Sequence, residues 1–118
     1  MKLSTKSLLS ALVAATVNSA PHTHHLTSQR HERRYEKVLQ KHDRKGELRA
    51  SVLGMDAVDF RQQERKYTMS RIVNLYGFQD ERAFYRAVVG KIRQELRSRG
   101  WTPERIQYFE TARLQRIA

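Results

Sequence analysis

The sequence contains no cysteine among its 118 residues, which excludes disulfides, thiolate metal ligands and cysteine nucleophiles. Acidic residues are also scarce: 12 Asp and Glu accompany 23 Lys and Arg, so the formal net charge is +11. An excess of this size attracts polyanions without specific contacts and says little about the fold. The composition therefore favours an acidic partner, such as a cell-envelope polymer, nucleic acid or an anionic lipid surface.

Long hydrophobic runs are absent as well. The apolar stretch from Leu8 to Val17 is much shorter than a membrane-spanning helix, which needs about 20 residues. No segment alternates between apolar and polar residues as a half-buried strand does, and apolar residues instead recur every three or four positions. The pattern predicts an all-α protein, with about five helices packed as a small orthogonal bundle and no transmembrane span in the mature chain.

Residues 1–20 have the organisation of a signal peptide. Lys2 and Lys6 give the segment a positively charged beginning, a short apolar stretch follows, and small residues end it. Cleavage after Ser19 or Ala20 would remove it. We therefore predict a secreted or extracytoplasmic protein of the cell envelope. An uncleaved membrane anchor is the alternative, which the shortness of the apolar stretch disfavours.

Residues 21–34 are predicted to be a flexible, His- and Arg-rich lead-in to a single helical domain over residues 35–118. The histidines of the lead-in have no fixed spacing, and no carboxylate or thiolate completes a tetrahedral set, so no metal site is predicted. Arg33 and Arg34 form a dibasic pair at which a protease of a eukaryotic secretory pathway would cut, and this alternative stays open. The histidines are His22, His24, His25 and His31.

A single long helix is predicted from Ser28 to Leu53, ended by Gly54. Gly46 falls on the apolar stripe of this helix, where a glycine lets a partner helix approach closely. His42 falls on the same stripe, and we interpret it as a core or boundary residue rather than as a ligand or a base.

Helix boundaries are marked repeatedly along the rest of the chain. Residues whose side chains accept hydrogen bonds from free backbone amides precede each expected helix, and glycines follow. Trp101 is predicted to pack on Leu96 before the last corner and on Ile106 after it, so that one side chain closes one helix and opens the next. The N-caps are Asp56, Thr68, Asp80 and Thr102, and the glycines are Gly54, Gly77 and Gly100.

From Glu81 to Arg99 the apolar residues fall on one face of a long amphipathic helix, which we expect to form the centre of the core. Four arginines cluster on another face, within roughly 60° of one another at about 100° per residue. Because a guanidinium binds phosphate or carboxylate through two parallel hydrogen bonds, this face is the candidate polyanion-binding site. The core residues are Phe84, Val88, Ile92 and Leu96, and the arginines are Arg82, Arg86, Arg93 and Arg97.

Two other interpretations of this helix stay open. A run of charge is more often a solvated face than a binding site. Alternatively, Ala83, Ala87 and Gly90 form a strip of small residues where the backbone of a partner protein could come close. Retention on heparin or nucleic acid that weakens with salt would indicate a polyanion, whereas salt-insensitive dimerisation would indicate a protein contact. The oligomeric state itself does not follow from these patterns.

No pattern in the sequence indicates catalysis. No glycine-rich phosphate loop follows a strand, the carboxylates are scattered, and the serines lack a histidine at a recognisable spacing. Asp56 and Asp59 lie close together in sequence, but the helix dipole explains both as charges of a first turn. The chain is therefore predicted not to be an enzyme and to use no cofactor.

Five short segments carry a first resemblance: Leu53 to Met55, Asp56 to Phe60, Ile72 to Phe78, Ala83-Phe84 and Gly100 to Ile106. In this order they are similar to small exported bacterial helical proteins of unknown function. Most of the matching positions are helix caps and core residues. The resemblance therefore implies a fold and an exported location, and it implies no chemistry.

A second, partial resemblance involves Ile72 to Asp80, Phe84 to Arg86 and Gly100 to Pro103. These segments are similar to the helix-turn-helix of AraC-type regulators, although the interval between the two glycine turns is longer here than in that family. The resemblance implies that a helix-turn-helix DNA-binding protein is the alternative function if the N-terminus is not a functional signal peptide. DNA would then be contacted by Glu81, Arg82 and Arg86.

Overall fold

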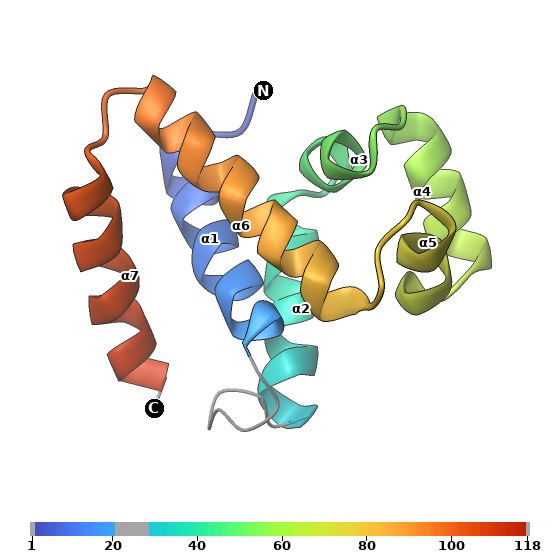
Figure 1. Ribbon diagram of the computed structural model, residues 1–118, viewed down its shortest axis with the longest axis horizontal. Coiled ribbons are helices and arrows are strands. Elements are labelled where there is room, and N and C mark those ends of the chain that lie inside the picture. The colour runs from blue at the N-terminus through green and yellow to red at the C-terminus, as the bar shows by residue number, and fades with distance from the viewer. Residues whose placement is uncertain (1, 21–28, 118) are drawn as a thin grey trace.

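The computed structural model describes residues 2–20 and 29–117, and within these residues every regular element is an α-helix (Figure 1). The all-α prediction is therefore confirmed, but the described residues form seven helices where about five were expected. The helices are α1 Thr5–Ser19, α2 Gln29–His42, α3 Glu47–Leu53, α4 Ala57–Lys66, α5 Met69–Leu75, α6 Glu81–Ser98 and α7 Pro103–Ile117.

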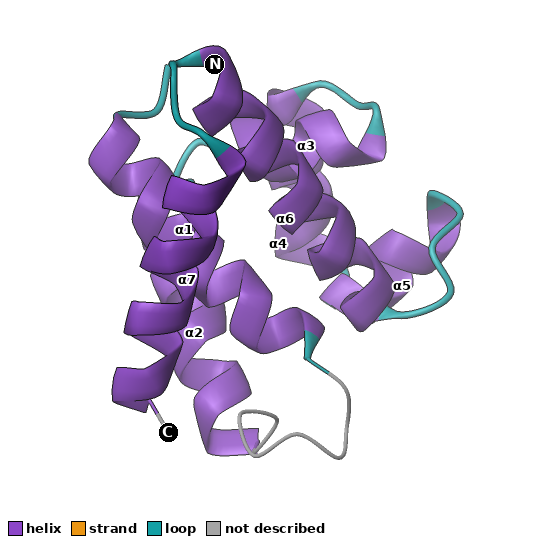
Figure 2. Ribbon diagram, turned by 60° about the vertical axis from the view of Figure 1, so that its left-hand side comes forward, coloured by secondary structure: helices purple, strands orange, loops and turns teal. Residues whose placement is uncertain are grey.

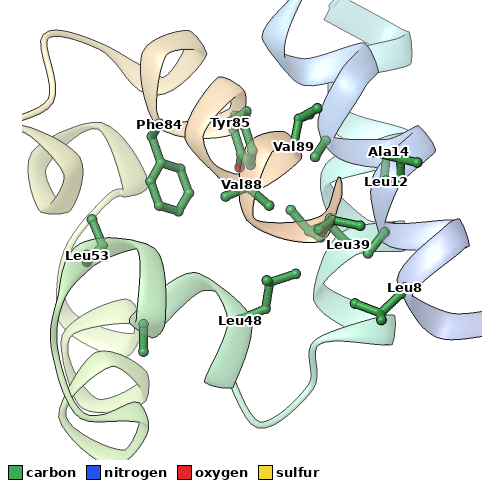
Figure 3. Close-up of a cluster of buried hydrophobic side chains, with 14 of the residues drawn as sticks. Leu8, Leu12, Ala14, Leu39, Leu48, Leu53, Phe84, Tyr85, Val88 and Val89 are labelled. Atoms are coloured by element: carbon green, nitrogen blue, oxygen red, sulfur yellow. The ribbon is translucent and has the colours of Figure 1, made fainter. Parts of the chain in front are cut away.

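Helix α6 lies at the centre of the fold, in contact with α1, α3, α5 and α7 (Figures 1 and 2). The apolar face predicted for it is confirmed. Figure 3 shows Phe84 and Val88 of this face in the buried cluster, between Leu53 of α3 on one side and Leu12 of α1 on the other. Each buried side chain of this size contributes about 1.5–3 kcal/mol to stability. The fully buried residues of the face are Phe84, Val88, Ile92 and Leu96.

Helix α1 packs against both α6 and α2. Its apolar face is completely buried, with Leu8, Ala11 and Leu12 at 0% exposure. The hydroxyl of Ser4 caps the helix by accepting a hydrogen bond of 3.1 Å from the amide of Ser7. The apolar stretch that we interpret as the centre of a signal peptide thus forms a core helix in the described fold.

The prediction of one helix from Ser28 to Leu53 is wrong, because α2 ends at His42 and α3 begins at Glu47. Gly46 lies between them with a φ of 75°, in the left-handed region that glycine tolerates best. A Cβ at this position would lie only 2.8 Å from Cδ2 of Phe60. The expected close approach at Gly46 is therefore present, but it occurs at a turn that brings α4 against the chain.

The N-terminal lead-in is described only in part. Residues 29–34 belong to the first turns of α2. Residues 21–28, with three of the four histidines of the lead-in, lie outside the described residues. As expected, none of the described helices has the length and apolar character needed to cross a membrane.

Several predicted helix boundaries are confirmed. Asp80 accepts a hydrogen bond of 2.8 Å from the amide of Ala83 at the start of α6. At the end of α6 the amide of Trp101 donates to the carbonyl of Leu96 at 3.0 Å, which closes the helix. The ring of Trp101 then meets Phe109 edge-on, with 6.4 Å between the ring centroids, so that this corner attaches α7. Asp56 and Thr68 also cap their helices, and Gly54, Gly77 and Gly100 have positive φ angles.

Candidate polyanion-binding surfaces

The four predicted site residues lie on α6, and we refer to Arg82, Arg86, Arg93 and Arg97 as the arginine stripe. Arg82 donates a hydrogen bond of 2.6 Å to Oε1 of Glu32 in α2, and its side chain is only 15% exposed. Arg86 and Arg97 are exposed and form no ion pair with the residues that the structure describes. The stripe is therefore not one uniform basic surface.

Arg93 is held by α7. Its Nε and Nη2 donate to the two carboxylate oxygens of Glu110 at 2.8 and 2.7 Å, which is the bidentate geometry that arginine forms with carboxylates. The hydrogen bond to Glu110 raises the pKa of Arg93 above its usual range. This pair neutralises one arginine of the stripe and joins α6 to α7, and its carboxylate partner Glu110 is buried.

A groove of about 600 Å³ runs between α6 and α7 beside this pair. Ile106 and Leu114 of α7 form apolar parts of its wall, and Arg97 lies along its α6 side. Gly90 also lines the groove, and no atom lies within 4 Å of the position that a Cβ would take there. The glycine of the predicted small-residue strip thus faces an open groove, whereas Ala83 and Ala87 are half-buried.

A buried ion-pair network lies on the other side of the molecule, between α2, α3 and α4. Asp43 and Arg49 are 1% and 2% exposed, and the Arg49 Nε donates to Asp43 Oδ2 at 3.0 Å. The same carboxylate accepts hydrogen bonds of 3.0 Å from the amides of Leu48 and Arg49, at the start of α3. Arg49 also binds Glu64 of α4, which in turn binds Arg61. The carboxylates of Asp43 and Glu64 are therefore already paired with arginines within the protein.

Basic side chains surround a shallow hollow of about 470 Å³ directly beside this network. Three of them come from α2 and the turn after it, and two come from α4. Among the described residues, Glu64 is the only acidic one that lines the hollow, and it is already paired with arginines. We refer to the five basic residues together as the basic hollow: Lys37, Lys41, Arg44, Arg61 and Arg65.

A second, smaller hollow of about 240 Å³ shares Lys41 and Arg44 with the first and continues toward Lys2 and Lys45. His42 lies in it, with its Nδ1 3.3 Å from the hydroxyl of Ser7. Burial lowers the pKa of His42, and the positive charges of Lys41 and Lys6 lower this pKa further. Only the contributions of the two lysines, and not that of burial, reflect the positive charge around the end of α2.

The basic hollow was not predicted from the sequence. A signal was available, since Lys37 and Lys41 are one turn apart on α2, as are Arg61 and Arg65 on α4. The sequence does not indicate that these two rows lie close together, because a continuous helix is predicted through Gly46, where the structure has a turn that brings α4 close to α2. The tertiary structure alone assembles them on one surface.

Acidic side chains gather elsewhere, around Tyr85. Burial raises the pKa of Glu36 and of Glu81, and the negative charge of neighbouring carboxylates raises both pKa values further. Burial also raises the pKa of Tyr85, with Glu36 and Glu81 contributing in the same direction. Within the described part of the chain, no three His, Asp or Glu residues come together in a way that could hold a metal ion.

Comparison with protein-family models, with curated proteins and with solved structures finds no match for this chain. Its function is therefore inferred from the charges and contacts described above.

Proposed function

We propose that this protein is a non-catalytic binding module for an acidic ligand. The observation that carries the proposal is the distribution of its few acidic residues. Among the residues that the structure describes, five of the 12 carboxylates form ion pairs with arginines, so they do not balance the remaining exposed lysines and arginines. The unbalanced surface attracts polyanions over distances up to about a Debye length, which is roughly 8–10 Å at moderate salt. The five are Glu32, Asp43, Glu64, Glu95 and Glu110.

On α6 the proposed contact residues are Arg86 and Arg97, because their guanidinium groups are exposed and free of internal carboxylates among the described residues. Arg82 and Arg93 would contribute less, since an external anion must compete with Glu32 and Glu110 for them. The arginine stripe is thus proposed to act mainly through two of its four members.

Salt-dependent retention of the full chain on immobilised heparin tests this function. We expect retention that weakens steeply as salt rises, because bound polyanions release counterions. Replacing Arg86 and Arg97 with Gln should weaken retention more than replacing Arg113 and Arg116 of α7, which removes the same charge from exposed positions. A wild-type chain that passes through heparin at low salt would refute the function.

We also propose that residues 1–20 direct export, so that the protein works outside the cytoplasm. Support comes from the exposed Lys2 and Lys6 ahead of the apolar stretch. Cleavage would remove α1, and the apolar faces of α6 and α2 that α1 covers would need to repack. N-terminal sequencing of secreted material should begin at Ala20 or Pro21, and recovery of the intact chain from the cytosol alone would contradict export.

A helix-turn-helix DNA-binding protein is the second candidate. It is favoured by one observation: α5 and α6 are consecutive helices joined by a short turn, and Arg86 is exposed in the second turn of α6. A selection from random duplex DNA would distinguish it. Enrichment of one sequence that disappears when Arg86 is replaced by Ala would support this candidate, whereas binding without sequence preference would contradict it.

A further inference from the structure

In the basic hollow, one row of cations from α2 and one row from α4 lie along a common surface. Lys37 and Lys41 are one helical turn apart, and Arg61 and Arg65 repeat that spacing on α4. Arg44 extends the first row just beyond the end of α2. Residues four apart on a helix lie about 6 Å from each other, so each row presents its charges at regular intervals.

Internal carboxylates leave most of this charge unbalanced. Glu64 lines the hollow, but it accepts from Arg49 and Arg61 and is only 15% exposed. Lys37, Lys41, Arg44 and Arg65 are exposed, and no ion pair joins them to any described residue. The basic hollow therefore differs from the arginine stripe, in which two of four members are paired.

The lining also indicates what kind of anion fits. No aromatic side chain lines the hollow in the described part of the chain, so it offers no platform on which a nucleobase could stack. It is shallow, and through Lys41 and Arg44 it continues into the neighbouring hollow, where Lys2 and Lys45 outnumber the one described carboxylate, Glu47, that is not buried. An extended row of cations without stacking groups suits a linear array of negative charges better than a single small anion.

We propose that the basic hollow binds a chain of phosphate groups, held by Lys37, Lys41, Arg44 and Arg65 through the phosphate oxygens. Both inorganic polyphosphate and the backbone of single-stranded nucleic acid supply this chemistry. The proposal rests on the proposed function in that both need a polyanion, but it assigns the ligand to a different surface from α6. Lys41 and Arg44 are the central contacts, because both hollows share them.

Binding of the full chain to a fluorescent single-stranded oligonucleotide of mixed sequence, with inorganic polyphosphate as competitor, tests this proposal. In the variant Lys41→Gln with Arg44→Gln we expect at least tenfold weaker binding of both probes. The slope of log affinity against log salt should flatten by roughly 0.7–0.9 for each phosphate that is no longer neutralised. Arg113→Gln with Arg116→Gln removes the same charge from exposed positions on α7 and should weaken binding much less.

The outcomes separate the two proposals and the two ligand sources. If the wild-type chain binds no polyanion, the proposed function fails and this inference fails with it. If the wild type binds but the Lys41/Arg44 and Arg113/Arg116 double variants weaken binding equally, the attraction is bulk charge and only this inference is overturned. Polyphosphate that displaces the oligonucleotide completely supports recognition of phosphates alone. An oligonucleotide that polyphosphate cannot displace would show that bases or sugars are recognised, which also overturns it.

Two controls test whether weaker binding comes from lost contacts rather than from unfolding. Because Lys41 and Arg44 are exposed, their double variant should keep the helical circular dichroism and melting temperature of the wild type. Lys37→Gln with Arg65→Gln, which removes one cation from each row, should reproduce the weaker binding if the first variant unfolds.

In the wild type, polyphosphate should raise the pKa of His42 measured by NMR, since it screens Lys41 and Lys6. No change in this pKa on saturation with polyphosphate would contradict binding beside Lys41.

Discussion

The arginine stripe of α6 and the basic hollow of α2 and α4 are both rows of cations, but the fold treats them differently. On α6, carboxylates from two other helices reach Arg82 and Arg93. At the basic hollow, the Asp43 carboxylate is turned inward to Arg49, and Glu64 is shared by Arg49 and Arg61, so Arg61 is the one cation of the hollow that pairs with a described carboxylate. A regular row of charge along one helix therefore does not by itself define a free binding surface, because the neighbouring helices decide which charges stay unbalanced.

The two regions also contain different kinds of ion pair. The Asp43–Arg49 pair is buried beside the basic hollow, and its members make four further hydrogen bonds: two join Asp43 and Arg49 to each other, and two reach the Leu48 amide and Glu64. The Arg93–Glu110 pair has equally good geometry, but the Arg93 side chain is 49% exposed. Removal of a partner from a buried pair costs far more than from an exposed one, because the remaining charge cannot be solvated. The two pairs should therefore respond very differently to substitution.

The largest effect is expected from Asp43→Ala. Removal of this carboxylate leaves the buried Arg49 with Glu64 alone and removes the cap of α3, so the free energy of unfolding should fall by about 3–5 kcal/mol. Chemical denaturation measures this. The matched control is Asp59→Ala, which removes an exposed carboxylate from the first turn of α4 and should cost under about 1 kcal/mol. Equal destabilisation of the two variants would show that the buried Asp43–Arg49 pair contributes no more to stability than an exposed carboxylate does.

Gly46→Ala should have the next largest effect. Alanine at a φ of 75° costs about 1–2 kcal/mol, and its Cβ would also press on the ring of Phe60, which adds about 1–3 kcal/mol. Gly54→Ala is a close control, because Gly54 has a φ of 73° but nothing within 4 Å of a Cβ position. Thermal unfolding should therefore place Gly46→Ala well below Gly54→Ala. Similar melting temperatures would mean that the close packing of α4 on this turn is not important for stability.

Glu110→Gln should free one more cation of the arginine stripe, so that the stripe, like the basic hollow, has most of its cations unpaired. It releases Arg93 from its carboxylate, so the affinity of the full chain for heparin should rise a few-fold, and the slope of log affinity against log salt should steepen by roughly one. The cost in stability should be about 1 kcal/mol or less, because Arg93 can be solvated. The double variant Arg93→Gln with Glu110→Gln should leave affinity nearly unchanged, since it removes the pair without changing the net charge. Unchanged affinity in Glu110→Gln would count against α6 as a polyanion surface.

The smallest effect is expected from Glu36→Gln, on α2. Burial raises the folded-state pKa of Glu36 above 4.5, so the stability associated with its protonated form is present at low pH and is lost as pH rises through the folded pKa. Removing the charge should therefore stabilise the protein at pH 7, by less than about 1 kcal/mol for a half-exposed group. The difference from wild type should disappear well below pH 4.5. A variant less stable than wild type at pH 7 would mean that Arg49 outweighs burial at this position.

Some features of this protein were predictable from local sequence. The buried face of α6 was correctly predicted from the spacing of Phe84, Val88, Ile92 and Leu96, because helical period and burial are set by the same local pattern. The caps at Asp56 and Asp80 and the ends at Gly54 and Gly100 were predictable for the same reason, since they depend on backbone geometry within a few residues.

The errors arose where a local pattern had two physical interpretations. Gly46 fits the apolar stripe of a continuous helix, yet in the fold it takes a left-handed conformation while the Asp43 carboxylate caps α3. The number of helices was underestimated for that reason, and because the apolar stretch near the N-terminus also forms a helix, α1, whose burial against α6 and α2 depends on distant residues. Neither outcome follows from the periodicity of the segment itself.

The sequence by itself determined that the chain is helical, where most helices end, which face of α6 is buried, and that basic residues outnumber acidic ones. Only the tertiary structure decided which cations are neutralised. Arg82 finds its carboxylate 50 residues away, and Arg93 finds Glu110 17 residues away on another helix. Because electrostatic interactions depend on distance and burial rather than on separation along the chain, the free basic surface exists only once the helices are packed.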